Sequence, residues 1–200
     1  VLNNLLTPLF TVFITGILTF VVIGPVMRVF GDGITSGLLW LINTLGPVGG
    51  AIFGFLYAPI VITGMHHSFT AVETQLLADI ATTGGSFIFP VAAMSNVAQG
   101  AAALSVLLVL KKDNKMKGIA SASGISALLG ITEPAIFGVN LKLRYPFYGA
   151  MIGTAVSSAY IMLTKVLALA PGAAGLPGII SIRPDSMINY IIGMAISMAV

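Results

Sequence analysis

Glu133, which stands directly before Pro134 in the stretch GITEP, is the side chain of this sequence best suited to chemistry. A carboxylate accepts two hydrogen bonds at once, which suits neighbouring hydroxyl groups such as those of a sugar ring. The alternative is a structural role, in which Glu133 pairs with Lys142 or Arg144 at a membrane surface. We favour the binding role, because an acid at membrane depth costs at least about 2.5 kcal/mol and needs a partner or a function.

His66 and His67 form a second polar group, just after Gly64 at the end of a long apolar run. A neutral imidazole offers one hydrogen-bond donor and one acceptor, and it can exchange a proton near neutral pH. The pair could instead cap the preceding helix at an interface. We favour a binding role, because Glu73 follows within two helical turns and the segment is unlike one that faces lipid.

Asn96 and Asn140 are further candidates for substrate binding, since their amides both donate and accept hydrogen bonds. Asn96 and Gln99 lie about one helical turn apart and therefore share a helix face. Packing between helices explains these amides as well as ligand binding does, and it is the interpretation that we favour for them.

Several kinds of site are excluded or disfavoured. The sequence contains no cysteine, so it can form no disulfide, thiolate metal site or cysteine nucleophile. It lacks the H-E-x-x-H motif of metalloproteases and the phosphate-binding loop of nucleotide-driven motors. The serine and histidine residues show no nucleophile-elbow motif. We therefore expect neither a metal site nor a cofactor.

The composition indicates a membrane protein. Only 8% of the 200 residues are charged, whereas 57% are hydrophobic, and a soluble domain has about 25% charged residues. Long runs contain no Asp, Glu, Lys or Arg, and a helix needs about 20 mostly apolar residues to cross a bilayer. These runs are 1–27, 33–72, 80–110 and 145–164. The sequence therefore predicts an all-α, polytopic membrane protein embedded in a lipid bilayer.

The positive charges do not indicate a nucleic-acid partner, although the net charge is +3. Four cations lie in one short segment, KKDNKMKG, beside an apolar run. Such clusters mark the cytoplasmic loops of membrane proteins. We therefore place Lys111–Gly118 in the cytoplasm and expect no nucleic acid to bind.

The apolar runs predict the helices that position the candidate residues. The stretch GPVGG interrupts one run, so we expect two shorter helices or one kinked helix there. No soluble domain and no low-complexity linker is visible. The expected helices are 9–27 after Pro8, 37–62 with its interruption, 90–110, 146–169 and one that begins near Met187.

The segment 119–131 is apolar but too short to cross a bilayer alone, so we expect a re-entrant arm. A residue before proline is disfavoured in the α conformation, which places a break in the chain at Glu133. Irregular backbone at membrane depth is tolerated where it is buried in protein or lines a wet cavity. Broken helices beside an acid are a common way to build a transporter's substrate site.

Three motifs carry a family resemblance over essentially all 200 residues: GITEPAIFGVNLKLRYPF, APIVITGMHHSFTAVETQLLAD and FPVAAMSNVAQGAA. Together they closely resemble the membrane-embedded IIC component of the bacterial phosphotransferase system (PTS). The resemblance is to the glucose superfamily, in its sucrose and trehalose (β-glucoside-like) branch. It implies an elevator-like transporter with broken helices, located as a multi-pass protein in the bacterial cytoplasmic membrane.

The resemblance also implies site roles and partners. Glu133 would contact the sugar hydroxyls, and His66 would help to bind the sugar and remove a proton, so both are candidate catalytic groups; His67 is a further candidate for binding. A phosphocysteine on a separate IIB domain, charged by an upstream IIA domain, would phosphorylate the disaccharide. The expected activity is that of a protein-phosphocysteine–sugar phosphotransferase working as a homodimer.

Two questions stay open at this stage. The sugar is expected to be sucrose, with trehalose or another β-glucoside as alternatives, because ASASGISALLGITEP resembles sucrose carriers whereas QLLAD and GLPGIISI also occur in trehalose carriers. An ion-coupled permease that releases unmodified sugar is the alternative mechanism. We interpret residues 1–200 as a fragment of an IIC domain, mainly its substrate-carrying C-terminal half, with the IIB domain and the first helices absent.

Overall fold

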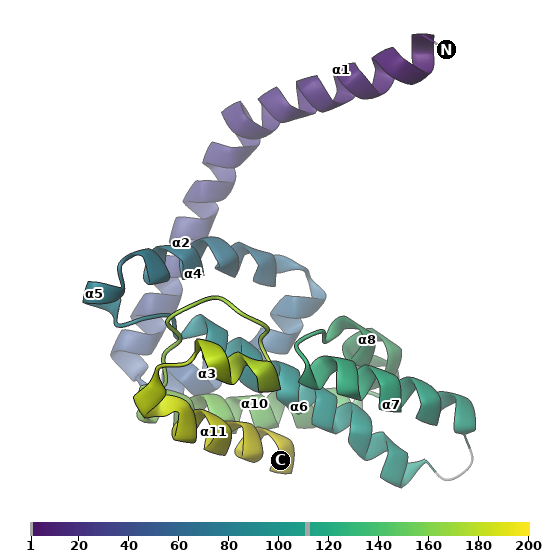
Figure 1. The fold of residues 1–200 in the computed structure, drawn as a ribbon, viewed down its shortest axis with the longest axis vertical. Helices are drawn as coiled ribbons and strands as arrows, with labels where there is room; N and C mark the ends of the chain where they lie inside the picture. Colours follow the sequence, from purple (N-terminus) through teal and green to yellow (C-terminus); the bar gives the residue numbers. More distant parts are fainter. Residues whose placement is uncertain (1, 111–112) are drawn as a thin grey trace. The chain divides into compact units, whose positions relative to one another are not determined.

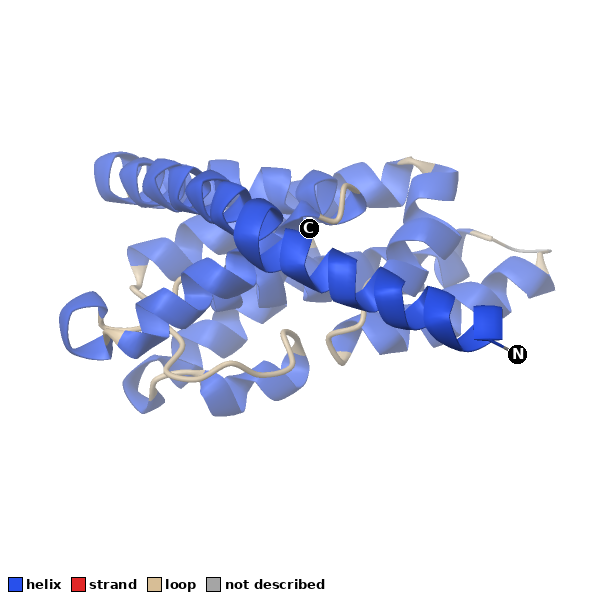
Figure 2. Ribbon diagram, turned by 90° about the horizontal axis from the view of Figure 1, so that it is seen from above, coloured by secondary structure: helices blue, strands red, loops and turns tan. Residues whose placement is uncertain are grey.

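Helices form the regular structure of the chain in a computed structural model that describes residues 2–110 and 113–200 (Figures 1 and 2). Within those ranges the only β-type pairing consists of two isolated antiparallel bridges, Ser86 with Ala168 and Ala168 with Ile182. The predicted all-α class is therefore confirmed. Two lysines of the predicted cytoplasmic loop, Lys111 and Lys112, lie outside the described residues.

The elements in chain order are α1 (Leu2–Leu18), η1 (Thr19–Ile23), α2 (Gly24–Leu45), α3 (Pro47–Ile62), η2 (Met65–Ser68), α4 (Phe69–Ala78), α5 (Ile80–Thr83), α6 (Ile88–Val109), α7 (Asn114–Leu128), α8 (Glu133–Ala135), η3 (Ile136–Asn140), α9 (Leu141–Leu143), α10 (Tyr145–Leu163), η4 (Leu176–Ser181), η5 (Pro184–Ser186) and α11 (Met187–Ala199). Of the short elements, η1 and η3 are π-helical turns, and η2, η4 and η5 are 3₁₀ turns.

Three described helices are long and apolar enough to cross a membrane: Leu6–Val26, Ile88–Val109 and Tyr145–Leu163. A fourth candidate is a broken one, in which Pro47–Ile62 and Met65–Ala78 meet at a bend of 114°. These helices overlap the predicted spans, but two bounds of the first one differ. Pro8 lies inside α1 rather than before it, and the helix does not end at Met27 but continues through η1 into α2 as far as Leu45.

The chain divides after Gly37 into two compact units. The first contains α1, η1 and the beginning of α2. Its candidate span has no side chain buried within the structure, as suits a helix with an apolar environment around it. The second unit, from Leu38 to Val200, contains every candidate site residue.

The frame of the second unit is a packed group of helices in which α10 contacts α3, α6 and α11 (Figure 1). Helix α6 is its centre, since every residue from Gly85 to Gly100 is buried. Gly54 lets α3 approach α10 closely: a Cβ atom there would stand 2.8 Å from the Thr154 carbonyl oxygen and in contact with the Ser158 side chain. Small residues at helix contacts allow this kind of packing in membranes.

The predicted interruption at GPVGG separates two helices. Gly46 has a φ of 52°, in the left-handed region that favours glycine, and α3 begins at Pro47 immediately after it. A second break follows at Gly64, with a φ of 76°, and turns the chain from α3 into η2 and α4. Two separate helices, rather than one kinked helix, therefore form here.

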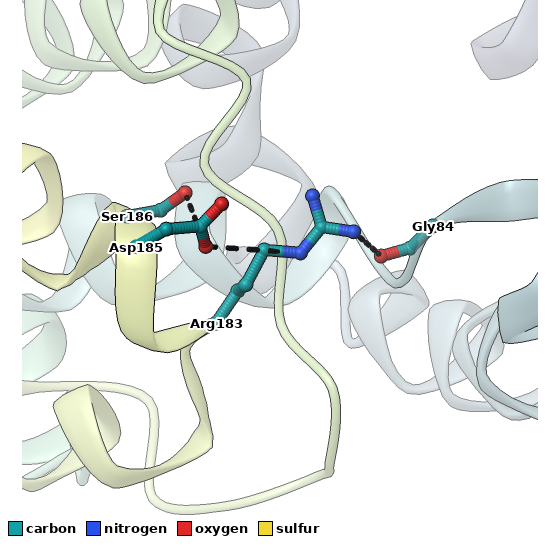
Figure 3. A network of polar contacts seen from close by, with 4 residues as sticks. All are labelled: Gly84, Arg183, Asp185 and Ser186. Atoms are coloured by element: carbon teal, nitrogen blue, oxygen red, sulfur yellow. Dashed lines mark hydrogen bonds and ion pairs between the residues drawn. The ribbon is translucent and has the colours of Figure 1, made fainter.

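Helix α10 ends at Leu163, earlier than the predicted Leu169. The residues that follow it instead pair with two other irregular segments of the chain, around Ser86 and around Ser181. Ser86 and Ala168 exchange backbone hydrogen bonds of 2.9 and 2.8 Å, and Leu169 N–H donates to the Ser181 carbonyl at 2.8 Å. The Arg183 guanidinium donates to the Gly84 carbonyl at 3.3 Å and lies 3.9 Å from Asp185 (Figure 3). These bonds stop the helix and fix its end.

The predicted re-entrant arm 119–131 corresponds to most of α7 and the turn that follows it. Helix α7 begins five residues before the predicted arm, at Asn114, because Asp113 caps it. The Asp113 carboxylate accepts a 2.9 Å hydrogen bond from the Met116 backbone N–H. Helix α7 packs against α6, and the segment α8–η3–α9 then folds back beside α7 and α6. The arm is thus one limb of a helical hairpin, whose turn, at Leu129–Thr132, leads into Glu133.

Candidate functional site

Glu133 is the first residue of α8, directly after the turn that ends α7. The break predicted at this position spans Leu129–Thr132, so the carboxylate stands on the helical side of it, at the N-terminal end of the segment. Its side chain is exposed, whereas Thr132 before it is buried. The partial positive charge of a helix N-terminus favours a negative group in this place.

His66 and His67 both lie on the η2 turn, which is the bend of the broken pair α3–α4. Their rings are neighbours, with centroids 4.0 Å apart and planes inclined by 36°. His67 is exposed, and His66 is half-buried. The Nδ1 atom of His66 is buried without a hydrogen-bond partner of regular geometry, although the Val61 backbone lies close enough to act on the ring.

Glu133 and His66 come from two separate breaks in the chain, and the charge of Glu133 reaches the His66 ring, although no hydrogen bond or ion pair within 4.0 Å joins the two described side chains. Each of Glu133 and His67 lies close enough for its charge to act on His66. We call Glu133, His66 and His67 the acid–histidine cluster. Among the described residues, neither Lys142 nor Arg144 forms an ion pair with Glu133. The exposed carboxylate is therefore accessible to a hydroxyl ligand, and the imidazole within range of its charge is a further donor or acceptor.

Asn96 lies on α6 and is occupied with backbone groups. Its Nδ2 atom donates to the Ala174 carbonyl at 2.6 Å and reaches the Gly130 carbonyl at 3.5 Å. The side chain is buried. It is thus joined to the turn before Glu133 rather than to the acid–histidine cluster itself.

Asn140 is also buried and ends the π-helical turn η3. Its Nδ2 atom donates to the Gln99 backbone oxygen at 2.9 Å and to Gln99 Oε1 at 2.6 Å. Asn140 Oδ1 and Gln99 Nε2 are buried without partners. Asn140 and Gln99 therefore connect η3 to α6, as the packing interpretation describes.

Tyr190 is a residue that the sequence did not single out. It is fully buried on α11, and its hydroxyl donates to the Gly175 carbonyl at 2.8 Å. The signal available in the sequence was a tyrosine inside an apolar run, with the glycine-rich stretch PGAAGLPG before it. Among the described residues, no three His, Asp or Glu side chains are grouped so that they could hold a metal ion.

The sequence was compared with known families and proteins. The family described as "Phosphotransferase system, EIIC" matches residues 1–155. The "PTS system sucrose-specific EIIBC component" of Pasteurella multocida is 66% identical over 199 residues, and the protein of that description in Vibrio alginolyticus is 67% identical over 197 residues. The "PTS system trehalose-specific EIIBC component" of Bacillus subtilis is 46% identical over 190 residues.

These alignments cover 100%, 98% and 95% of this chain but 42%, 41% and 40% of the respective relatives, so the chain spans about two fifths of their length. No solved structure matches it. The family match covers well over half of the chain, and the motifs around His66 and Glu133 fall inside the matched residues. The chain therefore belongs to the EIIC family of the phosphotransferase system.

Proposed function

We propose that this chain is the membrane carrier of a PTS sucrose transporter and that the acid–histidine cluster binds the sugar. The observation that carries the proposal is that the unpaired Glu133, at a helix start, lies within range of the charge of His66, at a chain bend far apart in the sequence. Because neither Lys142 nor Arg144 neutralises Glu133, the carboxylate remains open to a ligand with several hydroxyl groups.

The proposed chemistry follows from the groups of the cluster. The Glu133 carboxylate accepts hydrogen bonds from two neighbouring hydroxyls of the sugar, while His67 donates or accepts at the exposed side of the site. His66 accepts the proton of the hydroxyl that reacts. Its ring is half-buried and within range of the Glu133 charge, which makes His66, rather than the exposed His67, the proton acceptor that we propose.

The phosphoryl donor that the family resemblance implies is a phosphocysteine of a IIB domain. Because the present chain has no cysteine, that residue belongs to another domain or polypeptide. The sugar oxygen forms a bond to phosphorus as the sulfur–phosphorus bond breaks, the hydroxyl proton passes to His66, and the cysteine leaves as a thiolate. The names EIIBC and EIIBCA of the relatives support IIB and IIA as partners. We place the protein, as an elevator-like homodimer, in the bacterial cytoplasmic membrane.

Sucrose is the substrate that the comparisons favour. Three relatives described as sucrose-specific share 66%, 67% and 60% identity with the chain, against 46% for the trehalose-specific relative. Trehalose is therefore the second candidate.

We expect cells that produce this protein with a IIB partner, and that lack their own sucrose and trehalose uptake systems, to accumulate sucrose phosphate. Each labelled sugar would be supplied separately, and the label inside the cells would be separated into free and phosphorylated forms. Accumulation of trehalose phosphate without sucrose phosphate would mean that trehalose, and not sucrose, is the substrate. Free sucrose accumulating without phosphate would instead indicate an ion-coupled permease and would overturn the proposed reaction.

The two histidines are expected to differ. His66→Gln should reduce sucrose phosphorylation by about 10²-fold or more, the lower range for loss of a general base, because His66 is the ring beside Glu133. His67→Gln should change it by less than tenfold, since this side chain is exposed and the proposed reaction passes the proton to His66. Initial rates of phosphorylation in membrane vesicles would test this, and equal losses in the two variants would contradict the assignment.

A further inference from the structure

Two buried side chains from different helices hold the same short loop. Asn96 of α6 donates to the Ala174 carbonyl at 2.6 Å, and Tyr190 of α11 donates to the neighbouring Gly175 carbonyl at 2.8 Å. Tyr190 has no exposed surface, and Asn96 is only 8% exposed. A buried hydrogen bond that loses one partner leaves a polar group unsatisfied, so both bonds resist opening.

That loop in turn packs against the turn that leads into Glu133. A Cβ atom on Gly175 would collide with the Leu128 carbonyl and stand 3.0 Å from the Gly130 nitrogen. Gly130 has a φ of 104°, and a Cβ atom there would stand 3.3 Å from the nitrogen and oxygen of Ala174. The two backbones therefore touch directly, with only glycine fitting at the contact.

Asn96 also reaches the turn itself, since its Nδ2 atom lies 3.5 Å from the Gly130 carbonyl. One amide thus bridges the loop and the turn, and the tyrosine anchors the loop from the other side. Glu133 follows Gly130 after two residues, and no ion pair with Lys142 or Arg144 fixes its carboxylate. The position of the acid depends on the backbone that precedes it.

We propose that Asn96 and Tyr190 are positioning residues that hold the turn at Leu129–Thr132 and thereby set the position of Glu133. Asn96 then acts on the sugar through the backbone instead of contacting it. This inference rests on the proposed function for its effect on sugar binding. Its structural part, the fixing of the turn, is independent of any ligand.

The structural part is tested by hydrogen–deuterium exchange in the protein without sugar. Tyr190→Phe keeps the ring and removes the hydrogen bond to Gly175, so the amides of 128–133 should exchange at least about fivefold faster, as expected for one lost hydrogen bond. Tyr160→Phe is the matched control, because its hydroxyl donates to Asn189 Oδ1 at 3.0 Å and does not reach the loop. Equal exchange of 128–133 in both variants would overturn the proposal.

The functional part is tested by sucrose binding to the same proteins. Tyr190→Phe should weaken binding about fivefold, and Asn96→Ala, which removes the bridge, should weaken it by more than that. Both decreases in affinity should be smaller in a protein that already carries Glu133→Gln, because the effects of residues that act through one group are not additive. Tyr160→Phe should bind as the unchanged protein does.

The outcomes separate the two proposals. Faster exchange with full additivity between Asn96→Ala and Glu133→Gln would mean that Asn96 contacts the sugar directly, and the positioning role would fail. If the unchanged protein bound no sugar, the proposed function would fail, while the exchange comparison would still decide whether the two residues hold the turn.

Discussion

Glu133→Gln is expected to weaken sucrose binding by about 10- to 140-fold while leaving the helices intact. A hydrogen bond to a charged group contributes about 1.5 to 3 kcal/mol, and each 1.4 kcal/mol is a tenfold change in affinity. Glutamine keeps the size of the side chain but replaces one accepting oxygen with a donating amide, so it serves two sugar hydroxyls less well. Titration calorimetry on the purified protein would measure the change.

Asp79→Asn is the matched control, since Asp79 is an exposed acid in the turn between α4 and α5, away from α8 (Figure 1). We expect its affinity for sucrose to stay within twofold of the original. Glu133→Lys should bind less well than Glu133→Gln, because it places a cation beside His66. Unchanged affinity in Glu133→Gln would remove Glu133 from the site.

The membrane-crossing helices could be predicted from the sequence because their cause is local. The run without charges around α6 predicted residues 90–110, and the helix extends over Ile88–Val109. The break at Gly46 was also visible, since glycine releases the backbone from the usual restrictions. The break predicted at Glu133 lies just before it instead, at Leu129–Thr132, because Glu133 is already the first residue of α8 despite the proline that follows. Length, charge and the position of glycine and proline carry this information without any knowledge of the tertiary fold.

The ends of helices and the partners of buried amides could not be predicted, because other segments decide them. Helix α10 stops at Leu163 since Ala168 pairs with Ser86 and Ile182, both distant in the sequence. Asn96 and Gln99 share a helix face as expected, yet Asn96 contacts Ala174 and Gln99 contacts Asn140. Nothing in the spacing of these residues distinguishes a ligand from a partner in packing.

The acid–histidine cluster could be predicted only in part. Each member was visible as a polar residue at a break in an apolar sequence, so the candidates could be named. Their meeting could not be derived from spacing, because it depends on α3 packing along α10 and on α7 packing along α6. The contact between α3 and α10 therefore contributes to the position of His66, which follows α3.

Gly54→Ala should lower the thermal unfolding midpoint by roughly 2–12 °C, because overpacking of a tight contact typically costs about 1 to 3 kcal/mol. The added Cβ atom would stand 2.8 Å from the Thr154 carbonyl oxygen, and a backbone atom cannot rotate away as a side chain can. Helix α3 must then move from α10, and the η2 turn with His66 must move with it. A weaker affinity for sucrose should accompany the lower midpoint.

Gly149→Ala on α10 supplies the control, because nothing lies within 4 Å of the added carbon and alanine is favoured over glycine in a helix interior by up to about 1 kcal/mol. Its midpoint should stay the same or rise by a few degrees, and its affinity for sucrose should not change. Thermal melts of the two variants in the same detergent would give opposite signs. A fall of equal size in both would show that the close approach of α3 to α10 at Gly54 is not the cause of the lower midpoint.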